Sequence, residues 1–160
     1  MEIKKIIGAV HFDYSYSKLD GQETLEHQLL RQCWDNYLQQ QAVLDGRVLF
    51  YFSAFNFTED LTKYSPQALD REYRRREFLP ELFDDRMILF ENPHLPERGE
   101  LLTFFEEKDL RLADKTGGVF LGEFFDVCVA TRGKRITRVL DLDSFLVTYP
   151  KELSLLRASN

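Results

Sequence analysis

The segment GEFFDVCVATRG, residues 122–133, places one of the two cysteines directly after a run that is typical of a strand. A cysteine reacts as its thiolate, and the pKa of a thiol falls at a helix N-terminus or beside a protonated histidine. If a helix follows this strand, Cys128 occupies the position of a nucleophile. The alternative is an inert thiol, because cysteine is also a common small residue of protein cores.

Polar residues that follow two other expected strands could support such a nucleophile. His11 in HFDYSYS could take the thiol proton, and Glu91 in FENPH could orient the imidazole, as in catalytic triads on unrelated folds. Asp13 is a second candidate for the base. We therefore predict a catalytic set of Cys128, His11, Asp13 and Glu91. The simpler alternative is that His11 forms local hydrogen bonds and that Glu91 faces solvent.

Aromatic residues with polar groups gather at the same strand ends. Tyr14 and Tyr16 come from HFDYSYS, and Asn56 comes from FYFSAFNF. If the two strands are neighbours, these residues line one crevice that is apolar with a few hydroxyl groups, as in most pockets for small ligands. We predict that Tyr14, Tyr16 and Asn56 bind a small-molecule substrate. Filling of the core is the alternative.

The net charge of −6 disfavours nucleic acid or an anionic membrane surface as a partner. One basic cluster, REYRRREF at 71–78, could bind an anionic substrate through its arginines. Asp70, Glu72 and Glu77 largely balance it at helical spacings, which favours a solvated helix face. No apolar stretch is long enough to span a bilayer, so we expect a cytoplasmic protein with reduced thiols.

Metal and cofactor binding are not expected. Asp13, His27 and His94 lack the spacing of a metal site, and His27 is expected to be exposed near the start of a helix. No glycine-rich phosphate loop precedes a helix, which disfavours a dinucleotide cofactor. No Gly-x-Ser-x-Gly elbow occurs either, which disfavours a serine hydrolase.

The elements that must position these residues alternate along the chain. Strands are expected at 3–12, 47–55, 87–90 and 119–121, and helices at 22–44, 68–83 and 96–113, with Asp20 and Glu23 at capping-box spacing. Such alternation predicts an α/β fold with three α-β-α layers and a doubly wound, mainly parallel sheet of about five to six strands. With 44% hydrophobic residues, the 160 residues form a single domain, 1–160.

Residues 124–142 fit two structures. In the first, DVCVATRGKR is a short helix after a tight turn, and TRVLDLD is the fifth strand. In the second, FFDVCVAT and RITRVLDLD are the paired strands of a hairpin that turns at RGK, because Val127 and Val129 alternate as in a strand. Cys128 is structural in the hairpin.

The segment GEFFDVCVATRG resembles the Gly-x-x-x-Asp/Asn-x-Cys-Val motif of the isochorismatase-like cysteine hydrolases, with Gly122, Asp126, Cys128 and Val129 on the pattern. The order of elements agrees over most of the chain. The resemblance implies a strand order of 3-2-1-4-5-6, catalysis at the carboxyl ends of the strands, and an Asp–Lys–Cys triad acting on an amide-like substrate. It also adds Asp126 to the expected substrate-binding residues.

The sequence departs from the family pattern at two catalytic positions. His11 stands where the family has its aspartate, and Glu91 stands where it has its lysine. We therefore expect a divergent hydrolase with Cys128 as nucleophile. One alternative is a non-catalytic binding or assembly module of the same fold, which forms a homo-oligomer such as a homodimer. The other is an unrelated α/β protein with a C-terminal hairpin and a structural cysteine.

Overall fold

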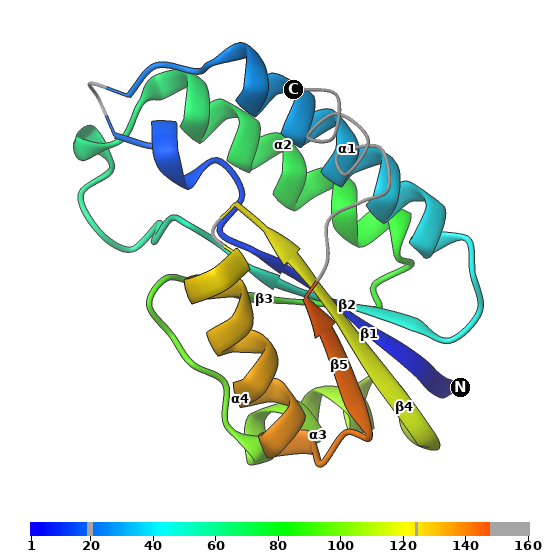
Figure 1. Cartoon of the computed structure of the whole chain (residues 1–160). Coiled ribbons are helices and arrows are strands. Elements are labelled where there is room, and N and C mark those ends of the chain that lie inside the picture. The colour runs from blue at the N-terminus through cyan, green and yellow to red at the C-terminus, as the bar shows by residue number, and fades with distance from the viewer. Residues whose placement is uncertain (19–20, 124, 148–160) are drawn as a thin grey trace.

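Parallel strands form a single sheet in the part of the chain that the structure describes (Figure 1). This computed structural model describes residues 1–18, 21–123 and 125–147. Within them the strand order is β3-β2-β1-β4-β5, and every neighbouring pair is parallel. The strands are β1 (Glu2–Val10), β2 (Arg47–Phe52), β3 (Met87–Phe90), β4 (Arg111–Gly122) and β5 (Ser144–Val147). The predicted α/β fold with a parallel sheet is confirmed.

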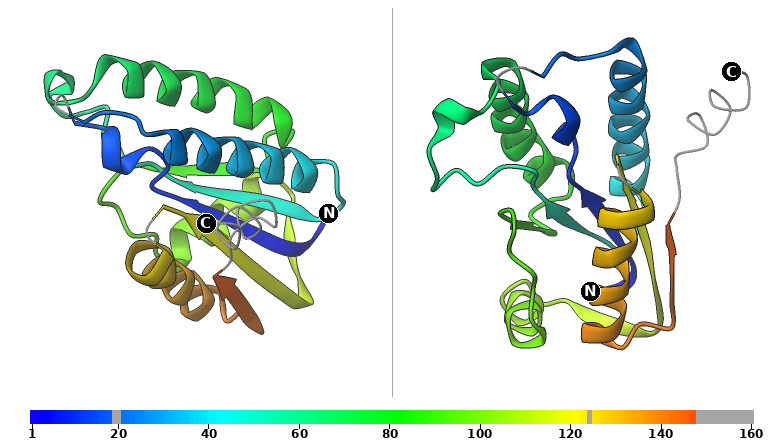
Figure 2. Two further views of the ribbon diagram at one scale, coloured as in Figure 1. Left: turned by 45° about the horizontal axis from the view of Figure 1, so that its top comes forward. Right: turned by 60° about the vertical axis from the view of Figure 1, so that its left-hand side comes forward.

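The helices cover both faces of this sheet, with α1 and α2 on one face and α3 and α4 on the other (Figures 1 and 2). Among the described helices, none is both long enough and apolar enough to cross a membrane. The α-helices are α1 (Leu25–Ala42), α2 (Pro66–Leu82), α3 (Arg98–Glu107) and α4 (Ala130–Leu140), with short turns η1 (Tyr14–Tyr16), η2 (Leu61–Lys63) and η3 (Phe125–Val129, a π-helix).

The central strand β1 is buried on both sides. Ile6 and Val10 pack into the core that α3 and α4 cover, whereas Ile7 and Ala9 pack into the core beneath α1 and α2. A strand enclosed in this way needs apolar side chains in both directions, which explains the continuous apolar run in the sequence.

Local side-chain caps fix where α1 and α2 begin. The Thr24 hydroxyl accepts a hydrogen bond from the backbone N–H of His27, so α1 begins at Leu25 and not at residue 22. The predicted capping residue Asp20 lies outside the described residues. Ser65 caps α2 in the same way, and Pro66 occupies its first turn, where proline leaves no helical hydrogen bond unmade.

The chain after β4 forms a strand–helix–strand unit. Residues Phe125–Val129 form a π-helical turn that runs directly into α4, and β5 then pairs parallel to β4. The hairpin interpretation is therefore wrong. The fifth strand predicted at 137–143 is also misplaced, because α4 continues to Leu140 and β5 covers Ser144–Val147. Helix α3 is shorter than the expected 96–113, since Arg111 already begins β4.

The direction of winding changes between β1 and β4. These strands are neighbours in the sheet, yet β1 leads to α1 on one face and β4 leads through η3 to α4 on the opposite face (Figure 1). In open parallel sheets, ligands bind at the carboxyl ends of strands where the order reverses in this way. The carboxyl ends of β1 and β4 are therefore the first place to look for a functional site.

Gly122 allows η3 to lie against the end of β1. A Cβ atom on Gly122 would lie 2.1 Å from the Val10 carbonyl oxygen and 2.9 Å from Val129 Cγ2. We predict that Gly122→Ala lowers the free energy of unfolding by about 1–3 kcal/mol, because the backbone must shift to admit the methyl group.

Gly99 provides a matched control, because a Cβ atom there meets no atom within 4 Å. Gly99→Ala in α3 is expected to raise stability by up to about 1 kcal/mol through helix propensity. Urea denaturation of both variants checks the pair. Equal stability of Gly122→Ala and the wild type would contradict the close packing of η3 on β1.

Candidate functional site

The chain reverses sharply after β1 and brings two of the predicted site residues to the carboxyl edge of the sheet. His11 and Asp13 both have positive φ angles, 54° and 68°, which is uncommon for residues other than glycine. The backbone N–H of His11 still donates to the Phe52 carbonyl of β2 at 2.8 Å. Glu123 follows β4 beside this turn, where its carboxylate accepts a 2.9 Å hydrogen bond from the backbone N–H of Ser15.

A buried histidine bridges the two carboxylates at this edge. His27 Nε2 lies 2.8 Å from Asp13 Oδ1, and its Nδ1 lies 3.2 Å from Glu123 Oε1. Both ring nitrogens face acceptors, so the arrangement is satisfied only when both carry a proton. Burial lowers the pKa of His27, but the hydrogen bonds to the two carboxylates outweigh burial and raise it above its ordinary value. His27 was expected to be exposed, and that prediction is wrong: its side chain is 4% exposed.

Asp13 is a fully buried anion held by two cations. Its Oδ2 accepts a 2.8 Å hydrogen bond from Arg75 Nη1, while Oδ1 faces His27. Burial raises the pKa of Asp13, yet the Arg75 charge and the hydrogen bonds from His27 and Arg75 lower it to about 2. A carboxylate with this pKa and these partners is a poor proton acceptor, so Asp13 does not fit the predicted role of base.

The inner side of α2 continues this polar network. Glu72 is fully buried and accepts hydrogen bonds from Tyr51 Oη and, at 3.0 Å, from Ser53 Oγ, both on or just after β2. Burial raises the pKa of Glu72 against the opposing effect of Arg75 and of these hydrogen bonds. Arg76 Nη2 in turn donates to Ser53 Oγ at 2.9 Å.

The expectation that 71–78 is a solvated helix face is therefore wrong for the inner half of the segment. Its buried members, Glu72 and Arg75, follow the same stripe as Ala68 and Leu79. These positions recur at spacings of three and four residues, so the helical period alone could have shown that two charged side chains of α2 face the core.

Glu91 does not orient His11. One carboxylate oxygen of Glu91 is paired with Arg76 Nη1, and the other accepts a 2.9 Å hydrogen bond from the backbone N–H of Phe57. Glu91 follows β3, which is separated from β1 by β2. Among the described residues, His11 Nδ1 has no hydrogen-bond partner. Glu91 therefore does not take the place of the acidic residue in the predicted Cys–His–Glu arrangement.

His11 is a buried, neutral histidine with an unused ring nitrogen. His11 is 4% exposed, and its ring stacks on the Tyr14 ring with 5.8 Å between the two ring centroids. Burial and then the nearby charge of Arg132 lower the pKa of His11 to about 4, although Glu123 acts in the opposite direction. Arg132 Nε, on α4, is likewise buried and without a hydrogen-bond partner in the described chain.

Cys128 lies in η3, at the start of the continuous helical segment that leads into α4. Cys128 is partly exposed and packs at the border of the core beneath α3 and α4, whereas Cys33 is buried. Arg132 follows four residues later and so lies on the same side of the helix. The charge of Arg132 also acts on His11, and both η3 and α4 contact β1, so the segment that holds Cys128 lies beside the end of β1. The Cys128 thiol makes no hydrogen bond to any described residue.

The predicted substrate-binding residues separate into different environments. Tyr14 lines a cavity of about 470 Å³ together with Ala54, which follows β2. Tyr16 is 2% exposed and packs in a small core with Phe55, so it fills the core and does not line the cavity. Asn56 accepts hydrogen bonds from the N–H and hydroxyl of Thr58 in a local turn. The side chain of Asp126 lies outside the described part of the structure.

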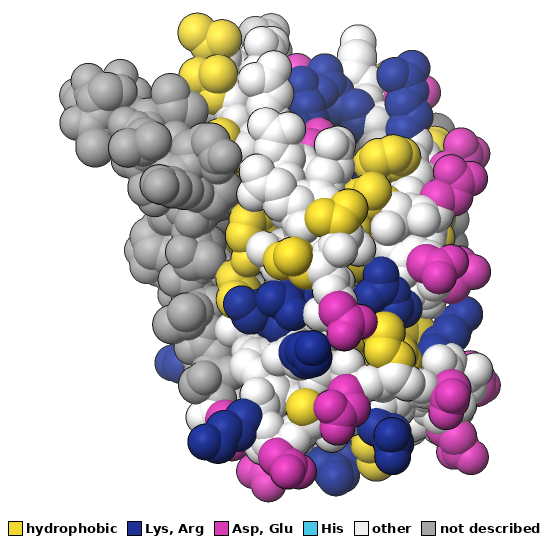
Figure 3. Space-filling view, turned by 90° about the vertical axis from the view of Figure 1, so that its right-hand side faces the viewer, with side chains coloured by type: hydrophobic (Ala, Val, Ile, Leu, Met, Phe, Trp, Pro, Cys, Tyr) yellow, Lys and Arg dark blue, Asp and Glu magenta, His cyan; other side chains and the backbone are white. Residues whose placement is uncertain are grey.

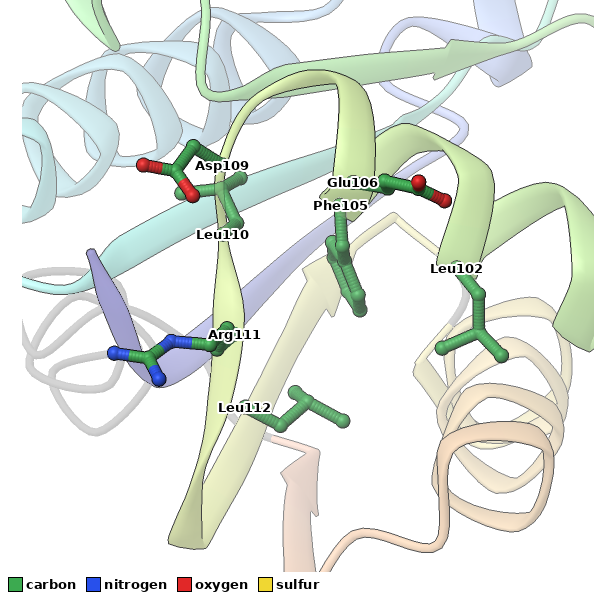
Figure 4. Close-up of a pocket in the computed structure, with 7 residues that line it drawn as sticks. All are labelled: Leu102, Phe105, Glu106, Asp109, Leu110, Arg111 and Leu112. Atoms are coloured by element: carbon green, nitrogen blue, oxygen red, sulfur yellow. The ribbon is translucent and has the colours of Figure 1, made fainter.

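A second cavity lies far from these groups. It has a volume of about 420 Å³ and lies between the end of α3 and the first residues of β4. Figure 4 shows the residues that line it: Leu102, Phe105, Glu106, Asp109, Leu110, Arg111 and Leu112. This is the amino end of β4, opposite the candidate site.

On the side of the molecule shown in Figure 3, Lys and Arg are interspersed with Asp and Glu. Among the described residues, no group of three or more His, Cys, Asp and Glu could hold a metal ion.

We predict that Arg75→Met destabilises the fold by about 3–5 kcal/mol, because it leaves the buried Asp13 carboxylate without its arginine. The adjacent Arg74 provides the control, since it pairs with Asp70 at 2.9 Å but is 78% exposed. Arg74→Met is expected to cost less than about 1 kcal/mol. Urea denaturation measures the free energy of unfolding of both variants. An equal decrease in the two variants would show that the buried Arg75–Asp13 pair contributes no more to stability than the exposed Arg74–Asp70 pair.

The two buried histidines predict opposite pH dependences of stability. The pKa of His27 is raised on folding, so its contribution is present below pH 6.5 and is lost as the pH rises through the folded value. The pKa of His11 falls from 6.5 to about 4, so its contribution is present above pH 6.5 and is lost as the pH falls toward 4. At about 1.4 kcal/mol per pKa unit, the His11 effect is about 3 kcal/mol.

Unfolding free energies measured from pH 4 to 9 check these signs. Relative to the wild type, His27→Gln should flatten the alkaline side of the profile, and His11→Asn should flatten the side below pH 6.5. Asparagine suits position 11 because it tolerates a positive φ. The assignment of charge to His27 does not hold if His27→Gln leaves the alkaline side unchanged.

The comparisons with known proteins give no family to which this geometry can be assigned. No protein-family model, curated protein or solved structure matches the chain. The resemblance carried by Gly122, Asp126, Cys128 and Val129 therefore has no independent support from these comparisons. What the protein does must be argued from the chemistry of the carboxyl edge itself.

Proposed function

We propose that this chain is a cysteine-dependent hydrolase that acts on a small amide-like substrate, with Cys128 as nucleophile and His11 as proton acceptor. The observation that carries the proposal is the position of Cys128. Cys128, a partly exposed residue, lies in the first turn of a helical segment, at the point where the winding of the sheet reverses. We interpret the domain as a doubly wound, three-layer α-β-α fold, in which ligands bind at this point.

Two features of the corner would stabilise the Cys128 thiolate. The unpaired N–H groups at the start of a helix carry partial positive charge and lower the pKa of a nearby thiol. Arg132, four residues later on the same helical side, adds a full positive charge whose Nε has no hydrogen-bond partner among the described residues. An electropositive, partly exposed setting of this kind distinguishes reactive cysteines from structural ones.

His11 would hold the proton that the thiol loses. Its Nδ1 has no hydrogen-bond partner among the described residues, and its pKa of about 4 keeps the ring neutral at pH 7, so that it can accept a proton. A thiolate formed beside it would raise the pKa of His11, since an adjacent negative charge favours the imidazolium. The thiolate then bonds to the amide carbon, the C–N bond breaks, and His11 returns the proton to the leaving amine. Water hydrolyses the resulting thioester.

The proposal treats the chain as a divergent relative of the isochorismatase-like hydrolases. The described strands have the order 3-2-1-4-5, which agrees with the family order 3-2-1-4-5-6 as far as it extends. His11 stands at the position of the family aspartate. Glu91, at the position of the family lysine, is paired with Arg76 and takes no part in the proposed chemistry.

A non-catalytic binding module of the same fold is the second candidate, and one observation favours it. Asp13 and Glu91, the acidic residues predicted for catalysis, are both committed to arginines, and the Cys128 thiol has no hydrogen-bond partner in the described structure. In such a module, exposed apolar residues such as Val127, which is 65% exposed, would contact a second copy or another protein.

The rate of alkylation of Cys128 at pH 7 separates the two candidates. We expect Cys128 to be modified well above the rate of the buried Cys33, which is the internal reference, with both rates read by peptide mass. Arg132→Gln should slow the alkylation of Cys128 several-fold, because it removes a positive charge that would stabilise the thiolate. Arg138→Gln, on the same helix but exposed, is the control and should leave the rate unchanged.

A reactive Cys128 would justify measuring hydrolysis of small amides by the wild type, Cys128→Ser and His11→Asn. If Cys128 reacts no faster than Cys33, or reacts only when the protein unfolds, the hydrolase proposal fails and the binding module is retained.

A further inference from the structure

The cavity beside Tyr14 has the size and position of a small-ligand site. Its volume of about 470 Å³ lies within the range of about 300–1,000 Å³ that is usual for such sites. Loops that follow three neighbouring strands contribute to it: Tyr14 and Ser17 after β1, Ala54 after β2 and Asn92 after β3. It therefore opens at the carboxyl edge of the sheet, where α/β proteins bind their ligands.

Backbone contacts hold the walls of this cavity together. Lys18 forms an isolated antiparallel bridge with Tyr64, and the backbone N–H of Ser65 donates to the Ser17 carbonyl at 2.7 Å. These contacts join the segment after β1 to the turn that precedes α2. Tyr64 is 8% exposed and packs against Phe55 at 4.9 Å between ring centroids, so the wall rests on a small core. The cavity has a supported wall and is more than a gap between surface side chains.

The lining of the cavity is positively charged. It includes Lys18 and Lys63, and none of the described residues that line it is acidic. Lys63 is paired with Glu59, which compensates its charge, and its ammonium lies 5.2 Å from the centre of the Tyr64 ring. Lys18 forms no ion pair with any described residue. Among the described residues, this leaves one positive charge of the lining without an acidic partner, which matches a ligand that carries one negative charge.

The remaining lining groups suit a carboxylate on a flat, apolar body. Tyr14 and Tyr64 supply ring surfaces, and Ser17 and Asn92 supply polar side chains. Tyr14 is 39% exposed, and its ring stacks on the buried His11. No arginine, whose planar fork suits phosphate, is among the described lining residues.

We infer that this cavity binds a small monocarboxylate with a planar apolar body, with Lys18 binding the carboxylate. The inference rests on the cavity and not on the chemistry of Cys128. If the proposed hydrolase function also holds, the stack of Tyr14 on His11 joins this cavity to the reacting corner, and the carboxylate belongs to the amide substrate.

Ligand-observed NMR titration with three matched probes tests the inference. Benzoate, benzamide and benzylamine share a ring and differ in charge. We expect the wild type to bind benzoate about tenfold or more tightly than the other two, because a hydrogen bond to a charged group is worth more than a neutral one. Lys18→Gln should remove this preference, while Lys115→Gln, which removes an exposed lysine on β4, should retain it.

Two further variants test the contribution of the Tyr14 ring and the independence of binding from Cys128. Tyr14→Ala should weaken all ring-bearing probes that bind, because it removes ring surface without changing the charge. Cys128→Ser should bind benzoate as the wild type does, so a failed hydrolase test leaves this one intact. The inference is overturned if benzamide binds as tightly as benzoate, or if Lys18→Gln retains the preference for benzoate.

Discussion

The carboxylate of Asp13 is fully buried, and a charge in that position must be compensated by groups that reach it from other elements. Arg75 reaches it from α2 and His27 reaches it from α1. His27 also contacts Glu123 at the end of β4. One anion after β1 thus fixes the approach of both helices on this face and joins them to the strand that precedes η3.

The same constraint explains why α2 carries charged residues on its inner side. Arg75 compensates the charge of Asp13. It also lies close to a second buried acid, Glu72, so that Arg75 lowers the pKa of Glu72 and Glu72 raises the pKa of Arg75. Tyr51 and Ser53 supply hydrogen bonds to Glu72 from the end of β2. Buried ion pairs seldom add much stability over an apolar core of the same volume, but removal of one partner is costly. Such a network specifies one arrangement of strand ends more than it strengthens the fold.

The sequence is sufficient for the fold class and the order of elements because those depend on local apolar periodicity. The alternation of Ile6, Ile7, Ala9 and Val10 between two cores is visible as a continuous apolar run. The position of Cys128 after a strand was also predictable. Partners across the sheet were not, because nothing local indicates that His27 lies between Asp13 and Glu123, which are 14 and 96 residues away. The pairing of Glu91 with Arg76, in preference to His11, likewise depends on strand order.

The polar groups at the carboxyl edge therefore divide into two sets with different chemical capacity. Asp13, His27 and Glu123 use their hydrogen-bonding atoms on one another, so they can position loops but have little left to offer a ligand. His11 Nδ1 and Arg132 Nε are buried and have no hydrogen-bond partner among the described residues. Leaving such atoms unpaired in a buried position costs free energy, and native structures rarely keep them without a reason. A ligand that reaches these two atoms would satisfy both, which is why we place the proposed chemistry with His11, Arg132 and Cys128.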